Sequence, residues 1–167
     1  MGALKNIFTF PFRLREKRKA DKYFKHITLS QIDSLNGYDF EEYIALLFES
    51  VGFKCDKTHK SKDNGVDIIA IKNNIRLAIQ TKLYYNHKVG NKAIQEVYTG
   101  NVYHKCNIPI VITNSYFSQP AINIAQELKV LLIDRKSLNN IINSNKNDKI
   151  YYFENLIYNY INNNESD

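Results

Sequence analysis

The alternation of helical and strand patterns between residues 37 and 142 constrains the fold most strongly. Apolar residues recur at helical spacing from Phe40 to Val51, and Gly52 ends that segment. Three strand-like segments follow, and two more alternate with helical ones. The predicted strands are 53–57, 66–71, 77–82, 109–113 and 130–133, and the later predicted helices are 91–104, 119–128 and 136–142. This order, helix-β-β-β-helix-β-helix-β-helix, predicts an α/β fold with a mixed central sheet flanked by helices.

The second and third predicted strands form a hairpin that brings polar residues together. Lys72-Asn73-Asn74 reads as the turn, so the start of the first strand faces the end of the second. Asp67 therefore lies near Gln80 and Lys82. Gln80 and Lys82 share one face because side chains alternate along a strand, and Asp67 fits the same face. An acid, an amide and a lysine thus converge at one end of the sheet.

These residue types suit metal-assisted cleavage of a phosphodiester. A hard cation needs oxygen ligands, which the Asp67 carboxylate, the Gln80 amide oxygen and the Thr81 backbone carbonyl supply. Lys82 can orient the attacking water and stabilise the developing negative charge. Taken singly, each of these residues is as well explained by a turn, a strand end or a solvated edge, so the prediction rests on their combination.

The Asp67…Gln80-x-Lys82 pattern resembles the PD-(D/E)xK nuclease core, in the variant with Gln for the second acid that is typical of Mrr-like restriction endonucleases. The similarity extends in order over roughly residues 37–142. It includes Gly37-Tyr38-Asp39-Phe40-Glu41, Ser61-Lys62-Asp63-Asn64-Gly65-Val66-Asp67, Val89-Gly90 with Gln95, and Thr113-Asn114-Ser115-x-Phe117-Ser118 with Ala121 and Ala125.

The resemblance implies a restriction-endonuclease-like core and a role for each matching residue. Asp67 and Gln80 are the implied metal ligands, together with the Thr81 carbonyl, and Lys82 is the implied catalytic lysine. Glu41 adds a carboxylate from the first helix, which balances the neutral Gln80, while Asp63 and Gln95 support the site. The implied cofactor is Mg²⁺, with Mn²⁺ able to substitute. The implied substrate is DNA, cut by a homodimer because one site per chain cuts one strand.

Positive charge concentrates at the start of the chain. Residues 1–26 hold eight Lys or Arg and two acidic residues, which equals the net charge of +6 of the whole chain. Such an arm contacts DNA phosphates, lies on an anionic membrane surface, or is simply a solvated terminus. The arm residues predicted to contact DNA are Arg13, Arg15, Lys17, Arg18 and Lys19. Further on, Tyr84, Lys88, Asn114 and Ser115 are candidates for DNA contacts, with turn formation as the alternative.

The sequence divides into a basic arm (1–30), a nuclease domain (31–145) and an Asn-rich tail (146–167) with one short amphipathic helix. No apolar run is long enough to span a bilayer. The two widely separated cysteines, Cys55 and Cys106, suit a reducing cytoplasm, with membrane association through the arm as the alternative. The sequence favours a metal-dependent DNA endonuclease that restricts foreign or modified DNA. The alternatives are a structure-specific repair or junction nuclease, a non-catalytic nucleic-acid- or membrane-binding module, and dependence on a separate recognition subunit.

Overall fold

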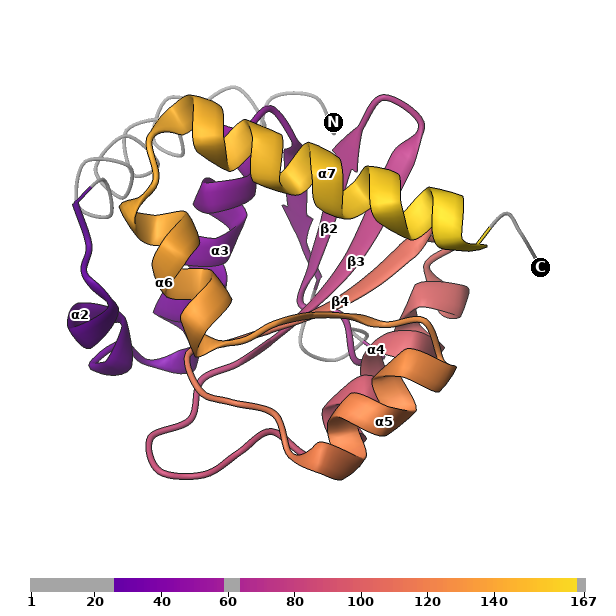
Figure 1. The fold of residues 1–167 in the computed structure, drawn as a ribbon, viewed down its shortest axis with the longest axis horizontal. Helices are drawn as coiled ribbons and strands as arrows, with labels where there is room; N and C mark the ends of the chain where they lie inside the picture. Colours follow the sequence, from indigo (N-terminus) through magenta and orange to yellow (C-terminus); the bar gives the residue numbers. More distant parts are fainter. Residues whose placement is uncertain (1–25, 59–63, 165–167) are drawn as a thin grey trace, which may run out of the picture.

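A five-stranded mixed sheet runs through the centre of the chain (Figure 1). The computed structural model describes residues 26–58 and 64–164 of the 167. The strands are β1 (Lys54–Lys57), β2 (Ile68–Lys72), β3 (Ile75–Lys82), β4 (Ile108–Thr113) and β5 (Leu131–Ile133). The helices are α2 (Leu29–Asp33), α3 (Gly37–Ser50), α4 (Asn91–Tyr103), α5 (Gln119–Glu127), α6 (Arg135–Asn143) and α7 (Lys146–Asn164).

The strands lie in the order β1-β2-β3-β4-β5. β1, β2 and β3 pair antiparallel, whereas β3, β4 and β5 pair parallel, with α4 and α5 as the helices that connect the parallel strands. A parallel pair requires such a crossover, and an antiparallel pair can close through a short turn. This arrangement confirms the predicted mixed sheet with an antiparallel hairpin at its front.

The hairpin between β2 and β3 has a tighter turn than the sequence suggested. Lys72 pairs directly with Ile75, so only Asn73 and Asn74 connect the strands. Asn73 has a φ of 55°, in the left-handed region that asparagine tolerates better than most residues. Because the turn has two residues, the pairing reaches Ile75, and β3 begins two residues before the predicted Leu77.

The sheet separates two apolar cores. Leu77 and Ile79 of β3 belong to a larger core with α3, α6 and α7, whereas Ala78 between them belongs to a smaller core with α4 and α5. This alternation follows from the opposite orientation of successive side chains in a strand. α4 and α5 lie side by side, as Figure 1 shows. The sheet is therefore covered by helices on both faces, which fixes the orientation of each strand residue.

The Asn-rich tail forms α7, a helix of 19 residues that is longer than the short helix expected there. α7 runs across the molecule in Figure 1 and buries Phe153 and Ile157, whose spacing of four residues places both on one face. The ring centroids of Phe153 and Phe48 of α3 are 4.6 Å apart. Among the helices of residues 26–58 and 64–164, none has both the length and the apolar character needed to cross a membrane.

We expect Phe153→Ala to lower the free energy of unfolding by about 3 kcal/mol, because it leaves a cavity in the larger core beside Phe48. The matched control is Tyr151→Ala on the same helix, since Tyr151 is 69% exposed; its effect should stay within about 0.5 kcal/mol. Urea unfolding followed by circular dichroism measures both. Equal effects of the two changes would show that α7 is not part of the core.

Candidate active site

Asp67 lies immediately before β2, opposite the end of β3. Its backbone N–H donates to the Ile79 carbonyl at 2.9 Å, which continues the hairpin pairing beyond Ile68. Three donors converge on its Oδ2 atom: Gln80 Nε2 at 2.7 Å, Thr81 N at 2.7 Å and Thr81 Oγ1 at 2.9 Å. An ionised carboxylate only accepts hydrogen bonds, so these contacts fix the orientation of the Asp67 side chain.

The Gln80 side chain is buried and has a defined orientation. Its Nε2 donates to Asp67 Oδ2 and also to the Thr81 carbonyl oxygen, 3.3 Å away. Because the amide nitrogen faces both of these oxygens, the amide oxygen is directed away from them. The predicted neighbours Asp67, Gln80 and Thr81 are therefore in direct contact.

Lys82, at the end of β3, is paired with an acid that the sequence analysis did not select. Its Nζ lies 3.1 Å from Oε2 of Glu96 on α4. The residue of α4 expected to support the site was Gln95, which is exposed. The apolar pattern of α4 could have distinguished the two, because Ala93, Ile94 and Val97 face the core and Glu96 flanks that face.

A glycine brings α4 close to this end of the sheet. Gly65 has a φ of +83°, and a Cβ there would lie 2.5 Å from the backbone oxygen of Glu96. Only glycine combines this backbone conformation with such a close approach. The segment leading to Asp67 therefore lies directly against the helix that carries Glu96.

Glu41 and Asp63 are the remaining predicted residues of the site. Glu41 is half-buried on α3, whose buried residues pack on the face of the sheet opposite α4. Asp63 falls outside the described residues. The structure as described contains no group of three or more His, Cys, Asp and Glu side chains placed to hold a metal ion.

Glu42, the neighbour of Glu41, has a separate partner. Its Oε2 lies 2.5 Å from Nζ of Lys57, which also lies 3.9 Å from the centre of the Tyr38 ring. Burial alone would lower the pKa of Lys57, but its contacts with Glu42 and Tyr38 outweigh that effect and raise the pKa above its usual value. A protonated Lys57 thus holds Glu42 in an ion pair.

The four candidate DNA contacts beyond β3 and β4 have different environments. Asn114 is fully buried: its Oδ1 accepts from the Tyr84 N–H at 2.8 Å, and its Nδ2 donates to the Tyr84 carbonyl and to Asp33. Ser115 Oγ donates to the His87 carbonyl at 2.8 Å. Asn114 and Ser115 therefore hold the loop after β3, and Lys88 is exposed on that loop. The predicted arm residues Arg13, Arg15, Lys17, Arg18 and Lys19 lie outside the described residues.

An ion pair between Asp33 and Arg135 joins distant parts of the chain beside this loop. The two guanidinium NH groups of Arg135 donate to the two Asp33 carboxylate oxygens at 2.7 and 2.8 Å. The hydrogen bond from Arg135 is the main reason that the pKa of Asp33 lies below its usual value. The residues are 102 positions apart, and no local pattern in the sequence pairs them.

Comparison with known proteins agrees with the fold. A family model described as restriction endonuclease, the Mrr catalytic domain, matches residues 32–142. A search of curated proteins gave no match. The crystal structure of the protein of unknown function AF1548 is similar with a TM-score of 0.52 and 24% identity, over 59% of this chain and 58% of that one. The DNA modification-dependent restriction endonuclease AspBHI is similar with a TM-score of 0.51 and 17% identity, over 72% of this chain and 34% of that one.

The two solved structures establish the fold alone, because sequences under 25% identical to this one carry no argument about function. The chain spans little more than half of the first and about a third of the second. The family match is more specific, because it includes Asp67, Gln80, Lys82 and Glu96 and covers well over half of the chain. The chain therefore belongs to the restriction endonuclease family.

Proposed function

We propose that this chain is a metal-dependent DNA endonuclease that uses Mg²⁺, with Mn²⁺ as a substitute. The observation that carries the proposal is the contact of the Asp67 carboxylate with Gln80 and Thr81 at the end of the β2–β3 hairpin where β3 ends at Lys82. Family membership supports the nuclease activity, and we assign the chain to restriction of foreign or modified DNA.

The donor atoms at the hairpin end fit a hard divalent cation. Asp67 offers a carboxylate, Gln80 an amide oxygen and Thr81 a backbone carbonyl, and oxygen ligands of these kinds suit Mg²⁺ and Mn²⁺. Coordination by Gln80 requires its amide to turn, because the Nε2 that now donates to Asp67 and Thr81 cannot face a cation. Glu41, Asp63 and Gln95 stay predictions for further ligation or support.

The bound cation would neutralise charge on the phosphate and lower the pKa of a coordinated water. In the hydrolysis, a water oxygen forms a new bond to phosphorus while the bond from phosphorus to the leaving oxygen breaks; the attacking water gives up a proton to the solvent, and the leaving oxygen takes up a proton from it. Lys82 donates hydrogen bonds to the phosphate oxygens and stabilises the negative charge that develops on them. Glu96 holds the Lys82 ammonium at the end of β3 through their contact of 3.1 Å.

The substrate and the binding partners of the chain are also proposed here. We infer DNA as the substrate from the family, and two copies of the chain for double-strand cleavage, because each chain carries one such site. A separate recognition subunit and a membrane contact of residues 1–26 are further proposals that experiments on the full chain can address.

Lys82→Ala should reduce cleavage of plasmid DNA in Mg²⁺ at least about 100-fold, since it removes a donor that stabilises the transition state. Lys72→Ala is a closely matched control: Lys72 is 28% exposed and forms an ion pair of 3.2 Å, against 23% and 3.1 Å for Lys82, but it lies at the turn end of the hairpin. The Lys72→Ala variant should cleave plasmid DNA at the wild-type rate. Equal activity of the two variants would contradict the assigned role of Lys82.

Asp67→Asn should weaken Mn²⁺ binding by at least about 10-fold, because it removes a charged ligand while keeping the size of the side chain. Isothermal titration calorimetry with Mn²⁺ measures the affinity, and a chelator should abolish cleavage by the wild-type chain. Asp148→Asn at the start of α7 serves as the control and should leave Mn²⁺ binding unchanged. Unaltered binding by Asp67→Asn would place the metal elsewhere.

Glu96→Gln should lower the maximal cleavage rate by about 10-fold with little change in KM, because the neutral amide holds the Lys82 ammonium less firmly. Gln95→Ala, on the exposed side of the same helix, provides the comparison. If Gln95→Ala lowers the rate and Glu96→Gln does not, the sequence-based choice of Gln95 was the better one. Steady-state kinetics on a labelled duplex distinguish these outcomes.

A further inference from the structure

A cavity of about 410 Å³ opens at the edge of the sheet where β3 and β4 end. It is lined by the loop 84–88 after β3, by residues 114–116 after β4, and by Asp33 and Arg135. Tyr84 follows Lys82 by two residues, so the cavity lies at the same edge of the sheet as the catalytic lysine. This volume lies within the range of pockets that bind small organic ligands, about 300–1,000 Å³.

The walls of the cavity are held in place by hydrogen bonds between its own residues. Asn114 fixes the backbone N–H and carbonyl of Tyr84, and Ser115 fixes the carbonyl of His87. Beyond the loop, Val89 donates to the Tyr116 carbonyl at 2.8 Å. A loop tied at both ends keeps its shape before any ligand arrives, which reduces the conformational entropy lost on binding.

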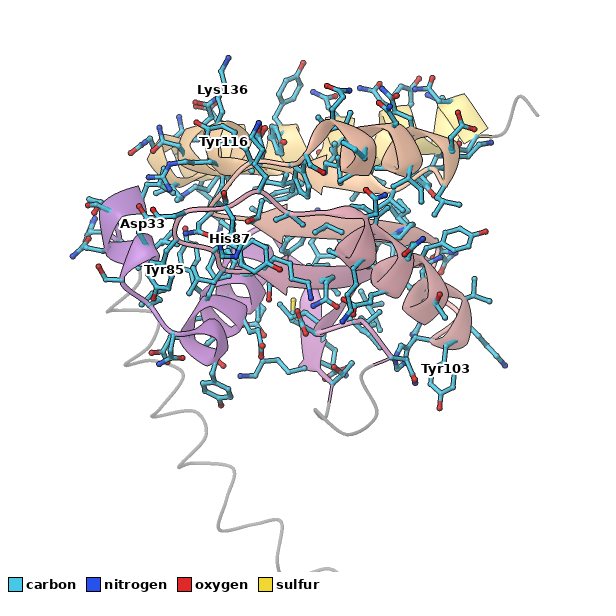
Figure 2. The ribbon with its side chains drawn as sticks, turned by 90° about the horizontal axis from the view of Figure 1, so that it is seen from below. Asp33, Tyr85, His87, Tyr103, Tyr116 and Lys136 are labelled. Carbon is cyan, nitrogen blue, oxygen red and sulfur yellow. The ribbon has the colours of Figure 1, made fainter. Side chains whose placement is uncertain are left out.

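Aromatic ring faces are the main surface that the cavity offers to a ligand. Tyr85 is 68% exposed and Tyr116 is 49% exposed, although Tyr85 is anchored by its hydroxyl, which donates to the Leu35 carbonyl at 3.2 Å. Figure 2 shows Tyr85, His87 and Tyr116 at the same end of the molecule as Asp33, whereas Tyr103 lies at the opposite end. Exposed rings that line one cavity provide platforms for stacking.

The charges around the cavity favour an anionic ligand. The Asp33 carboxylate is neutralised by its two hydrogen bonds from Arg135 and receives a third from Asn114. Lys88, exposed on the lining loop, adds a positive charge at the rim. A flat aromatic group attached to a phosphate satisfies both the rings and the cation, and that combination is a nucleotide.

We propose that this cavity binds one unstacked nucleobase of the DNA strand, a few nucleotides from the phosphate that is cleaved; this rests on the proposed function. The two residues from Lys82 to Tyr84 span about 7 Å of extended chain, and two stacked nucleotides of one DNA strand span about the same length. The base in the cavity is therefore a few nucleotides from the phosphate that Lys82 contacts. The base stacks on Tyr85 and Tyr116, and its phosphate contacts Lys88. DNA with unpaired bases is then preferred, because unstacking a base costs least where it is not paired.

The test compares two single strands of equal length, an oligothymidine and an abasic strand with the same phosphates. Binding by the full chain is measured by fluorescence anisotropy in a chelator, so that no cleavage occurs. The wild type should bind oligothymidine about 10-fold more tightly than the abasic strand. The double change Tyr85→Ala with Tyr116→Ala should remove this preference and leave affinity for the abasic strand unchanged.

Two further double variants separate stacking from other effects. Tyr85→Phe with Tyr116→Phe keeps the rings and should keep the preference, which would show that the rings, and not hydrogen bonds from the hydroxyl groups to the base, carry it. Tyr103→Ala with Tyr158→Ala removes rings that are equally exposed but lie outside the cavity, and should also keep the preference. Thermal unfolding of each variant checks that the fold is retained, as expected for exposed residues.

No preference in the wild type, or a preference that survives the double alanine change, would overturn the proposal. The binding assay does not depend on cleavage, so the two proposals fail separately. A chain that prefers oligothymidine through Tyr85 and Tyr116 but never cuts DNA contradicts only the endonuclease. A chain whose cleavage depends on Lys82 but which ignores bases contradicts only the base cavity.

Discussion

The hydrogen bonds that Gln80 and Thr81 donate to Asp67 depend on one property of the fold, the register of the β2–β3 hairpin. A slip of one residue would turn Gln80 and Lys82 to the other face of the sheet, away from α4. The two-residue turn at Asn73 and Asn74 opposes such a slip. So do the two cores, because Leu77 and Ile79 pack on one side and Ala78 on the other. The packing of the apolar residues thus determines where the polar site forms.

Charge balance explains why Glu96 matters at this end of the sheet. With Gln80 neutral, Asp67 alone would supply the negative charge opposite the Lys82 ammonium. Glu96 adds a second carboxylate, which lies 3.1 Å from Lys82 and 3.7 Å from the exposed Lys92, so the negative charge near Lys82 does not depend on Asp67 alone. A second carboxylate at this end of the sheet suits the proposed divalent cation. In this proposal, Glu96 supplies from α4 part of the charge that the sequence interpretation assigned to Glu41.

The loops after β3, β4 and β5 are held by a network of polar side chains. Asn114 is buried and must find its partners inside the protein, which it does by bonding to Tyr84 and Asp33. Arg135, which is partly exposed, bonds to Asp33 and to the Asn114 carbonyl. These contacts hold the loops in a fixed shape at the edge of the sheet where Lys82 ends β3. The same network that satisfies buried groups also leaves the rings of Tyr85 and Tyr116 exposed towards one cavity.

The sequence alone determined the order of helices and strands, the hairpin, and the closeness of Asp67 and Gln80 at its end; the hydrogen bonds from Thr81 to Asp67 came from the structure. These features follow from side-chain periodicity and from pairing across one short turn, which are local in the chain. Only the tertiary structure decided that Lys82 pairs with Glu96, that Asp33 pairs with Arg135, and that Asn114 is buried as an organiser of a loop. Each of these contacts joins separate elements, whose relative positions depend on how the helices pack against the two faces of the sheet. The physical reason is that helical periodicity defines the buried face of a helix but not which residue on the border of that face meets a strand end. Glu96 lies beside Lys82, whereas Gln95, which the family resemblance implied as support for the site, is exposed.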